Sequence, residues 1–174
     1  MSTQALGAAA AGTAIVGGGG TLAAYAAGAF GSSSELYYWM KSKNLLDKYI
    51  GGDLTRIEEK IKNGGNSTNS GYKKNLNDNW DEMKKEDFPE GSRPERPDKN
   101  KIANAGQTSD TDSNDLKDIA NFVNKWCELR LGKGTVKFKE NTNPKEYDEG
   151  KLTDPKDDVD KKWKAFREVC VADS

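Results

Sequence analysis

Histidine is absent from this chain of 174 residues, and cysteine occurs only at Cys127 and Cys170. Without histidine the chain lacks the most common general base and cannot form the usual serine or cysteine triads. Two cysteines that lie far apart in the sequence cannot form a four-cysteine zinc site or a CxxC motif. The sequence therefore predicts no catalytic residue, no cofactor and no metal site, and it disfavours an enzyme.

Two short patterns have the form of functional motifs, but simpler explanations account for both. Ser70-Gly71-Tyr72-Lys73 matches SxxK, yet the chain has no Ser-Asp-Asn or Lys-Thr-Gly partner motif. With 11 serines and 22 lysines, one such match is expected by chance. The segment 110–114 opens like a calcium loop, but Asp115 and Asn121 stand where glycine and glutamate are needed. Helix capping before Leu116 explains the same residues.

Charged residues are missing from the first 34 positions. All 27 basic and 28 acidic residues lie between Glu35 and Ser174. This border predicts two parts of different character, an apolar N-terminal segment and a polar domain. The near balance of charge in the domain argues against a nucleic-acid-binding protein, which needs a basic surplus to displace counterions from phosphates.

The charge-free part has the length of a membrane-spanning helix. Ala5–Phe30 would extend about 39 Å as a helix, enough to cross a hydrocarbon core of roughly 30 Å with some tilt. Large apolar side chains are few, and the run Gly17–Gly20 weakens the helix. We favour a retained single-pass anchor in the cell membrane, with the lipid bilayer as a partner. Small residues four positions apart, such as Gly7 and Ala11, would also permit self-association of two anchors.

Two alternatives remain for this segment. Ala24-Tyr25-Ala26 and Ala27-Gly28-Ala29 have the form of a signal-peptide cleavage site, although the first four residues carry no basic charge. The other alternative is a flexible tract outside the membrane. Sidedness is also open, because three lysines lie between positions 41 and 48, and the positive-inside rule would place the domain in the cytoplasm.

The rest of the chain predicts a mainly α-helical fold with at most a short β element. The expected order is an anchor or signal segment over 1–34, a helical region over 35–87, a proline-rich polar linker over 88–113 and a two-helix Trp/Cys region over 114–174. Within the first helical region, apolar spacing predicts helices over 35–50, 54–63 and 72–86.

The two-helix Trp/Cys region contains the clearest periodicity. Residues 114–130 predict a helix with one apolar face: Leu116, Ile119, Ala120, Val123, Trp126 and Cys127. Residues 135–139 alternate as in a short strand, and Asp154-Pro155 predicts the start of a last helix. The apolar face of that helix contains Val159, Trp163, Phe166 and Cys170. All four tryptophans of the chain fall on apolar helical faces, so we expect them in the core.

Three segments carry a resemblance: the start MSTQALGAAAAGTAIVGGGG, the helix ANFVNKWCELR and the C-terminal VDKKWKAFREVC. With these the chain resembles uncharacterised paralogous protein families of haemotropic mycoplasmas, bacteria without a cell wall that live on red blood cells. In such families the final helix often carries tryptophan and cysteine side by side, whereas Trp163 and Cys170 are apart here. The resemblance implies a bacterial surface protein, antigenically variable in such families, and assigns no catalytic residue.

Cys127 and Cys170 each lie on the apolar face of a predicted helix, near its C-terminal end. We expect them to form a disulfide if the domain lies outside the cell, and to remain buried free thiols if it lies in the cytoplasm. A disulfide needs Cα atoms within roughly 7 Å of each other. The two helices would then have to run in the same direction or cross with their C-terminal ends together.

These features together predict a non-enzymatic, membrane-anchored surface or interaction protein. An antigen or an adhesin that binds an unknown protein partner would fit, with the domain outside the cell. The alternatives are a secreted protein with a cleaved signal peptide and a membrane scaffold that faces the cytoplasm.

Overall fold

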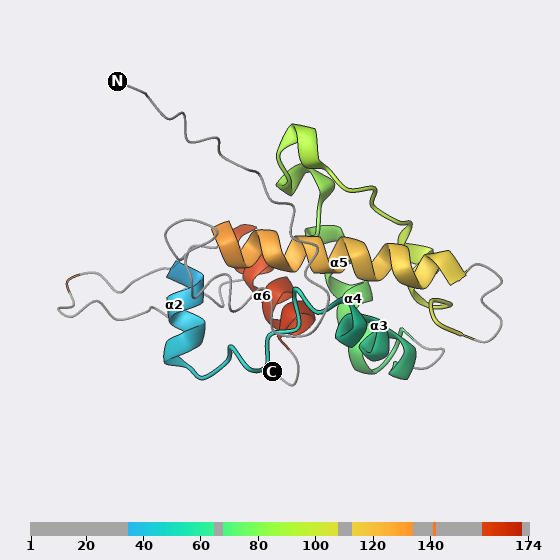
Figure 1. Cartoon of the computed structure of the whole chain (residues 1–174), viewed down its shortest axis with the longest axis horizontal. Coiled ribbons are helices and arrows are strands. Elements are labelled where there is room, and N and C mark those ends of the chain that lie inside the picture. Colours follow the sequence, from blue (N-terminus) through green and yellow to red (C-terminus); the bar gives the residue numbers. More distant parts are fainter. Residues whose placement is uncertain (1–34, 65–67, 108–112, 134–140, 142–157, 172–174) are drawn as a thin grey trace, which may run out of the picture.

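The computed structural model describes residues 35–64, 68–107, 113–133, 141 and 158–171 (Figure 1). This part of the chain is mainly helical, as predicted, and within it the β structure is limited to an isolated antiparallel bridge between Tyr49 and Val171. None of the described helices is both long and apolar enough for a membrane span. The predicted anchor over 1–34, the predicted strand over 135–139 and the predicted cap at Asp154-Pro155 lie outside the described residues.

The longest helix, α5 (Ser113–Lys133), runs along the molecule, with α2 towards one end and α3 and α4 towards the other (Figure 1). Helices α2, α3 and α6 all contact it. The predicted apolar face of α5 is confirmed, and Phe122 and Leu131 extend it. Its buried residues are Leu116, Ile119, Ala120, Phe122, Val123, Trp126, Cys127 and Leu131.

The helix predicted over 35–50 is shorter than expected. Helix α2 (Glu35–Ser42) ends where the Ser42 hydroxyl donates to the carbonyl of Trp39 at 2.7 Å. Asn44 then adopts a left-handed conformation with φ of 53°, which an α-helix cannot continue through. The following residues form a loop up to the start of α3.

Helix α3 (Leu54–Asn63) matches the prediction at both ends. The Asp53 side chain accepts a hydrogen bond from the backbone N–H of Arg56 at 3.0 Å, which caps the first turn. The N–H of Gly64 donates to the carbonyl of Ile61 and closes the last turn. Ile57 and Ile61 are fully buried against the core.

The helix predicted over 72–86 is divided into three short helical segments. Helix α4 (Gly71–Asn79) continues into the 3₁₀ turn η1 (Trp80–Glu82), and η2 (Lys85–Asp87) follows after a break. Leu76, Trp80 and Met83, which stand at the helical spacing behind this prediction, are nevertheless fully buried. The apolar face was predicted correctly, although the backbone is not one continuous helix.

The segment predicted as a linker over 88–113 differs most from expectation. Its described part, 88–107, contains the 3₁₀ turns η3 (Glu90–Ser92) and η4 (Lys99–Ile102) and packs on the domain. Phe88, Ile102 and Ala105 join the same buried cluster as residues of both predicted helical regions. The prolines do prevent an α-helix here, but the described residues on either side share one core.

Helix α6 (Asp158–Cys170) places Trp163, Phe166 and Cys170 in the core, as predicted. The ring of Trp163 packs edge-on against Trp39 of α2, with centroids 4.7 Å apart. All four tryptophans are buried, which confirms that they anchor the core. In α2, Tyr37 and Trp39 pack inward, and Tyr38 between them is exposed.

Candidate functional site

The two cysteines are brought together in the core. The Cα atoms of Cys127 and Cys170 are 5.6 Å apart, which is within disulfide distance, and both side chains are fully buried. Cys127 lies in the C-terminal third of α5, and Cys170 is the last residue of α6. The two helices therefore meet through their C-terminal parts. This is one of the two arrangements that would permit a bond between them.

The loop between α2 and α3 covers this pair. The backbone N–H of Ile50 donates to the carbonyl of Cys170 at 2.9 Å, and Tyr49 forms the bridge with Val171. At Gly51, a Cβ atom would lie 2.7 Å from the Cβ of Cys127 and 2.2 Å from the Tyr49 hydroxyl oxygen. The close approach of this turn to Cys127 therefore requires glycine at position 51.

The next glycine fixes the same turn on α5. Gly52 has φ of 85°, a conformation that other residues rarely adopt, and its N–H donates to Oδ1 of Asn124 at 2.5 Å. In the sequence, the pair Gly51-Gly52 indicates only an interruption between two helices. Its contact with the cysteines depends on pairing across more than 70 positions, which no local pattern reveals.

A polar cluster surrounds Asp87, at the place where η2, α5 and α6 meet. The Asp87 carboxylate is only 8% exposed and accepts hydrogen bonds from Nε1 of Trp126 at 2.9 Å and from Nζ of Lys162. Burial alone would raise the pKa of Asp87, but these two donors and the nearby charges of Lys162 and Arg130 outweigh it and lower the pKa. The carboxylate is thus held ionised and occupied by donors from two helices.

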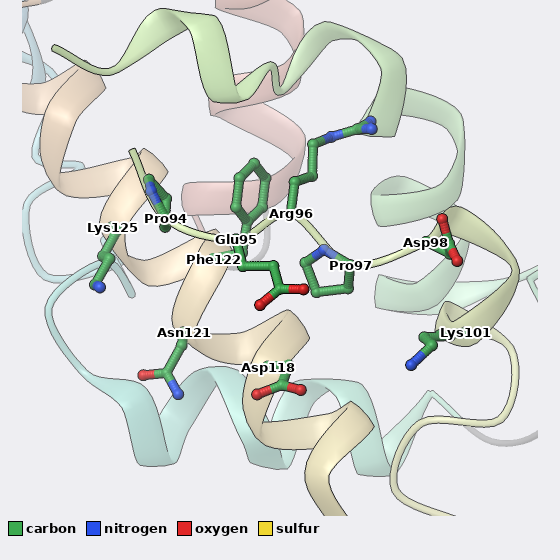
Figure 2. A pocket seen from close by; sticks show the side chains of 10 residues that line it. All are labelled: Pro94, Glu95, Arg96, Pro97, Asp98, Lys101, Asp118, Asn121, Phe122 and Lys125. Atoms are coloured by element: carbon green, nitrogen blue, oxygen red, sulfur yellow. The ribbon is translucent and has the colours of Figure 1, made fainter. Parts of the chain in front are cut away.

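A shallow groove of about 480 Å³ lies between the segment 94–98 and one face of α5 (Figure 2). Figure 2 shows the carboxylates of Glu95 and Asp118 towards the hollow, with Asn121 beside them. The side chain of Arg96 points away and donates to the carbonyls of Trp80 at 2.7 Å and Met83 at 2.9 Å. The groove therefore presents both acidic and amide groups on an exposed surface and contains no cysteine.

The SxxK pattern is explained by packing. Lys73 is fully buried, and its Nζ donates to the carbonyl of Ala103 at 3.0 Å, which fastens the segment after η4 to α4. Ser70 is exposed and precedes the first residue of α4. Among the residues that the structure describes, no group of three or more cysteine, aspartate or glutamate side chains is arranged to hold a metal ion. The calcium-like residues at 110–112 lie outside the described residues.

Comparisons with models of known protein families, with curated proteins and with solved structures found no match to this chain.

Proposed function

We propose that this chain is a membrane-anchored surface or interaction protein without enzymatic activity. The observation that carries the proposal is the distribution of charge, with no charged residue before Glu35 and 55 charged residues after position 34 (27 basic and 28 acidic). A long charge-free tract is typical of a segment in lipid, and a domain with balanced charge is typical of an aqueous surface. The segment 1–34 would hold the helical domain at the membrane.

The cysteine pair supports a position outside the cell. Disulfides form and persist in oxidising compartments and are rare in the cytoplasm. The pair lies at bonding distance and joins α5 to the end of α6. The resemblance to mycoplasma surface families agrees with this position, whereas the lysines at 41–48 favour the cytoplasmic side through the positive-inside rule.

A binding role fits the exposed surface better than a chemical one. The groove between 94–98 and α5 offers carboxylates and an amide that could meet polar groups of a protein partner. The polar side chains of Asp87 and Lys73 are engaged in hydrogen bonds within the fold. An adhesin or antigen is the function class we propose, with its partner unnamed.

Cell fractionation tests the membrane part of the proposal. The full-length chain and a variant that starts at Ser34 would be expressed in the same cells, and membrane and soluble fractions would be compared without detergent. We expect the full-length chain in the membrane fraction and the shortened chain in the soluble fraction. Equal solubility of the two chains would contradict both the anchor and the signal interpretation.

Mass spectrometry of the mature protein separates the remaining alternatives. A retained anchor predicts that residues 5–30 are still present in the membrane-bound protein. A new N-terminus at position 27 or 30 would instead support a secreted protein with a cleaved signal peptide. Cys127 and Cys170 that are fully alkylated without reductant, in protein from its native host, would support the cytoplasmic scaffold.

A further inference from the structure

The outer side of α2 carries an unusual aromatic residue. Leu36, Trp39 and Met40 face the core, whereas Tyr38 is 54% exposed. Among the described residues, no other large hydrophobic side chain has this degree of exposure. Tyrosine combines an apolar ring with a polar hydroxyl, and it is enriched where proteins meet the interface of a bilayer.

Three lysines follow this tyrosine in the sequence. Lys41, Lys43 and Lys48 are all exposed, and between Glu35 and Asp53 the one acidic residue is Asp47. The loop also contains two half-buried leucines, Leu45 and Leu46. Basic residues near an exposed aromatic ring are the combination that favours the surface of an anionic membrane.

A second exposed lysine pair lacks this surplus. Lys84 and Lys85 are adjacent and exposed, but four acidic residues, Asp81, Glu82, Glu86 and Asp87, are within three positions of them. The basic character of 38–48 is therefore local, and this second lysine pair provides a matched control.

The position of α2 in the chain places it near the membrane if residues 1–34 are an anchor. Helix α2 begins at Glu35, five residues after Phe30, and five residues reach at most about 18 Å. The interfacial zone itself adds roughly 5–8 Å on each side of the hydrocarbon core. Helix α2 is about 12 Å long, so it and the loop after it can lie along that zone.

We propose that the surface formed by Tyr38, Lys41, Lys43 and Lys48 lies on the anionic headgroups of the membrane that holds residues 1–34. This inference rests on the proposed function and adds the lipid charge that the domain recognises. The three ammonium groups face the headgroup charges, and the ring of Tyr38 enters the interface. The domain is thereby held flat on the bilayer rather than free at the end of a tether.

Lysine acylation of the full-length chain tests this surface. The chain would be incorporated into vesicles of phosphatidylcholine alone or of phosphatidylcholine with phosphatidylglycerol, separated by flotation and treated with an amine-reactive reagent. Mass spectrometry would then give the modification of each lysine. We expect about fivefold protection of Lys41, Lys43 and Lys48 in the anionic vesicles and none at Lys84 and Lys85. In 1 M salt, where the Debye length is about 3 Å, the protection should disappear.

Two charge-reversal variants complete the test. K41E/K48E should float with both kinds of vesicle and lose the protection of Lys43, whereas K84E/K85E should behave like the unchanged chain. Equal modification of Lys41 and Lys48 in both vesicles, with flotation intact, would overturn the lipid surface and leave the anchor standing. Loss of protection in K84E/K85E as well would also overturn it. A full-length chain that floats with neither vesicle would contradict the proposed function and remove the basis of this inference.

Discussion

At the scale of single residues, Gly51 is a position where the backbone lies close against the core. Its turn lies on Cys127, and the Tyr49 hydroxyl occupies the space where a side chain would begin. The contact leaves no room for a methyl group without movement of the turn or of α5. The neighbouring backbone hydrogen bond from Ile50 to Cys170 would be disturbed by either movement.

G51A should therefore destabilise the domain by about 1–3 kcal/mol, the usual cost of an added methyl group in a packed site. Gly91 is the matched control, because a Cβ atom there would have no neighbour within 4 Å. G91A should change the free energy of unfolding by less than about 0.5 kcal/mol. Chemical denaturation of the two variants measures this, and equal stabilities would show that the turn does not pack on Cys127 as described.

Asp87 gives a second prediction at this scale, with a defined pH dependence. D87A removes the acceptor of Trp126 and Lys162 and should cost about 1.5–3 kcal/mol at neutral pH. D81A is the control, because Asp81 is 73% exposed and its ion pair with Lys99 should contribute less than about 1 kcal/mol.

The lowered pKa of Asp87 sets the direction of the pH effect. A carboxyl group whose pKa is lower in the folded state stabilises the fold above its unfolded pKa, about 3.9. This stabilisation is lost as the pH falls through the folded value. The difference in unfolding free energy between D87A and the unchanged chain should therefore shrink below about pH 4. A difference that grows on acidification would contradict the assignment.

At the scale of elements, the spacing of apolar residues predicted those helices whose position depends on the local sequence. Helix α5 has six apolar residues on one face between Leu116 and Cys127, and it forms as predicted. The ends of α3 were equally clear, because Asp53 and Gly64 provide a cap and a stop within the local sequence. The helix over 35–50 was predicted too long, because the left-handed residue Asn44 has no strong signal in the sequence.

The segment 88–107 shows why a linker was predicted where the chain is packed. The segment contains three prolines and many charged residues, which indicate a linker. Its buried apolar side chains are few and scattered: Phe88, Ile102 and Ala105. A long-range polar contact also holds the segment. The guanidinium of Arg96 lies 5.1 Å above the ring of Trp80 and bonds two backbone carbonyls.

R96A should release this segment from the core. We expect a loss of about 1.5–3 kcal/mol in unfolding free energy, because a charged donor with two carbonyl partners is removed. Hydrogen exchange should become faster between residues 88 and 98, before it does so in α5. R93A is the control, because Arg93 is exposed, and it should leave exchange in this segment unchanged. Slow exchange in R96A would indicate that other contacts hold the segment.

At the scale of the whole molecule, the cysteine pair joins parts that are 43 positions apart. A bond across such a loop should stabilise the domain by about 4 kcal/mol if chain entropy dominates, a large share of the total for a small domain. The candidate pair itself could be chosen from the sequence, because only two cysteines exist and both lie on apolar faces. The turn at Gly51-Gly52 and the groove beside α5 could not be predicted from the sequence, because both depend on contacts between distant segments.

Reduction should therefore lower the thermal midpoint by roughly 10 °C, with the helical circular dichroism at 20 °C retained. C127A/C170A provides the matched chain, and its midpoint should not respond to reductant. The same midpoint for the oxidised and reduced protein would show that the bond is absent or does not contribute to stability.

We propose that the N-terminal segment holds this domain on the outside of the cell. Protease treatment of intact cells that express the full-length chain tests it most directly, with a cytoplasmic protein as the control for lysis. We predict that added protease removes the domain after position 34 while the cytoplasmic control stays intact. A domain that is digested only after the cells are opened would contradict the claim and place it on the cytoplasmic side.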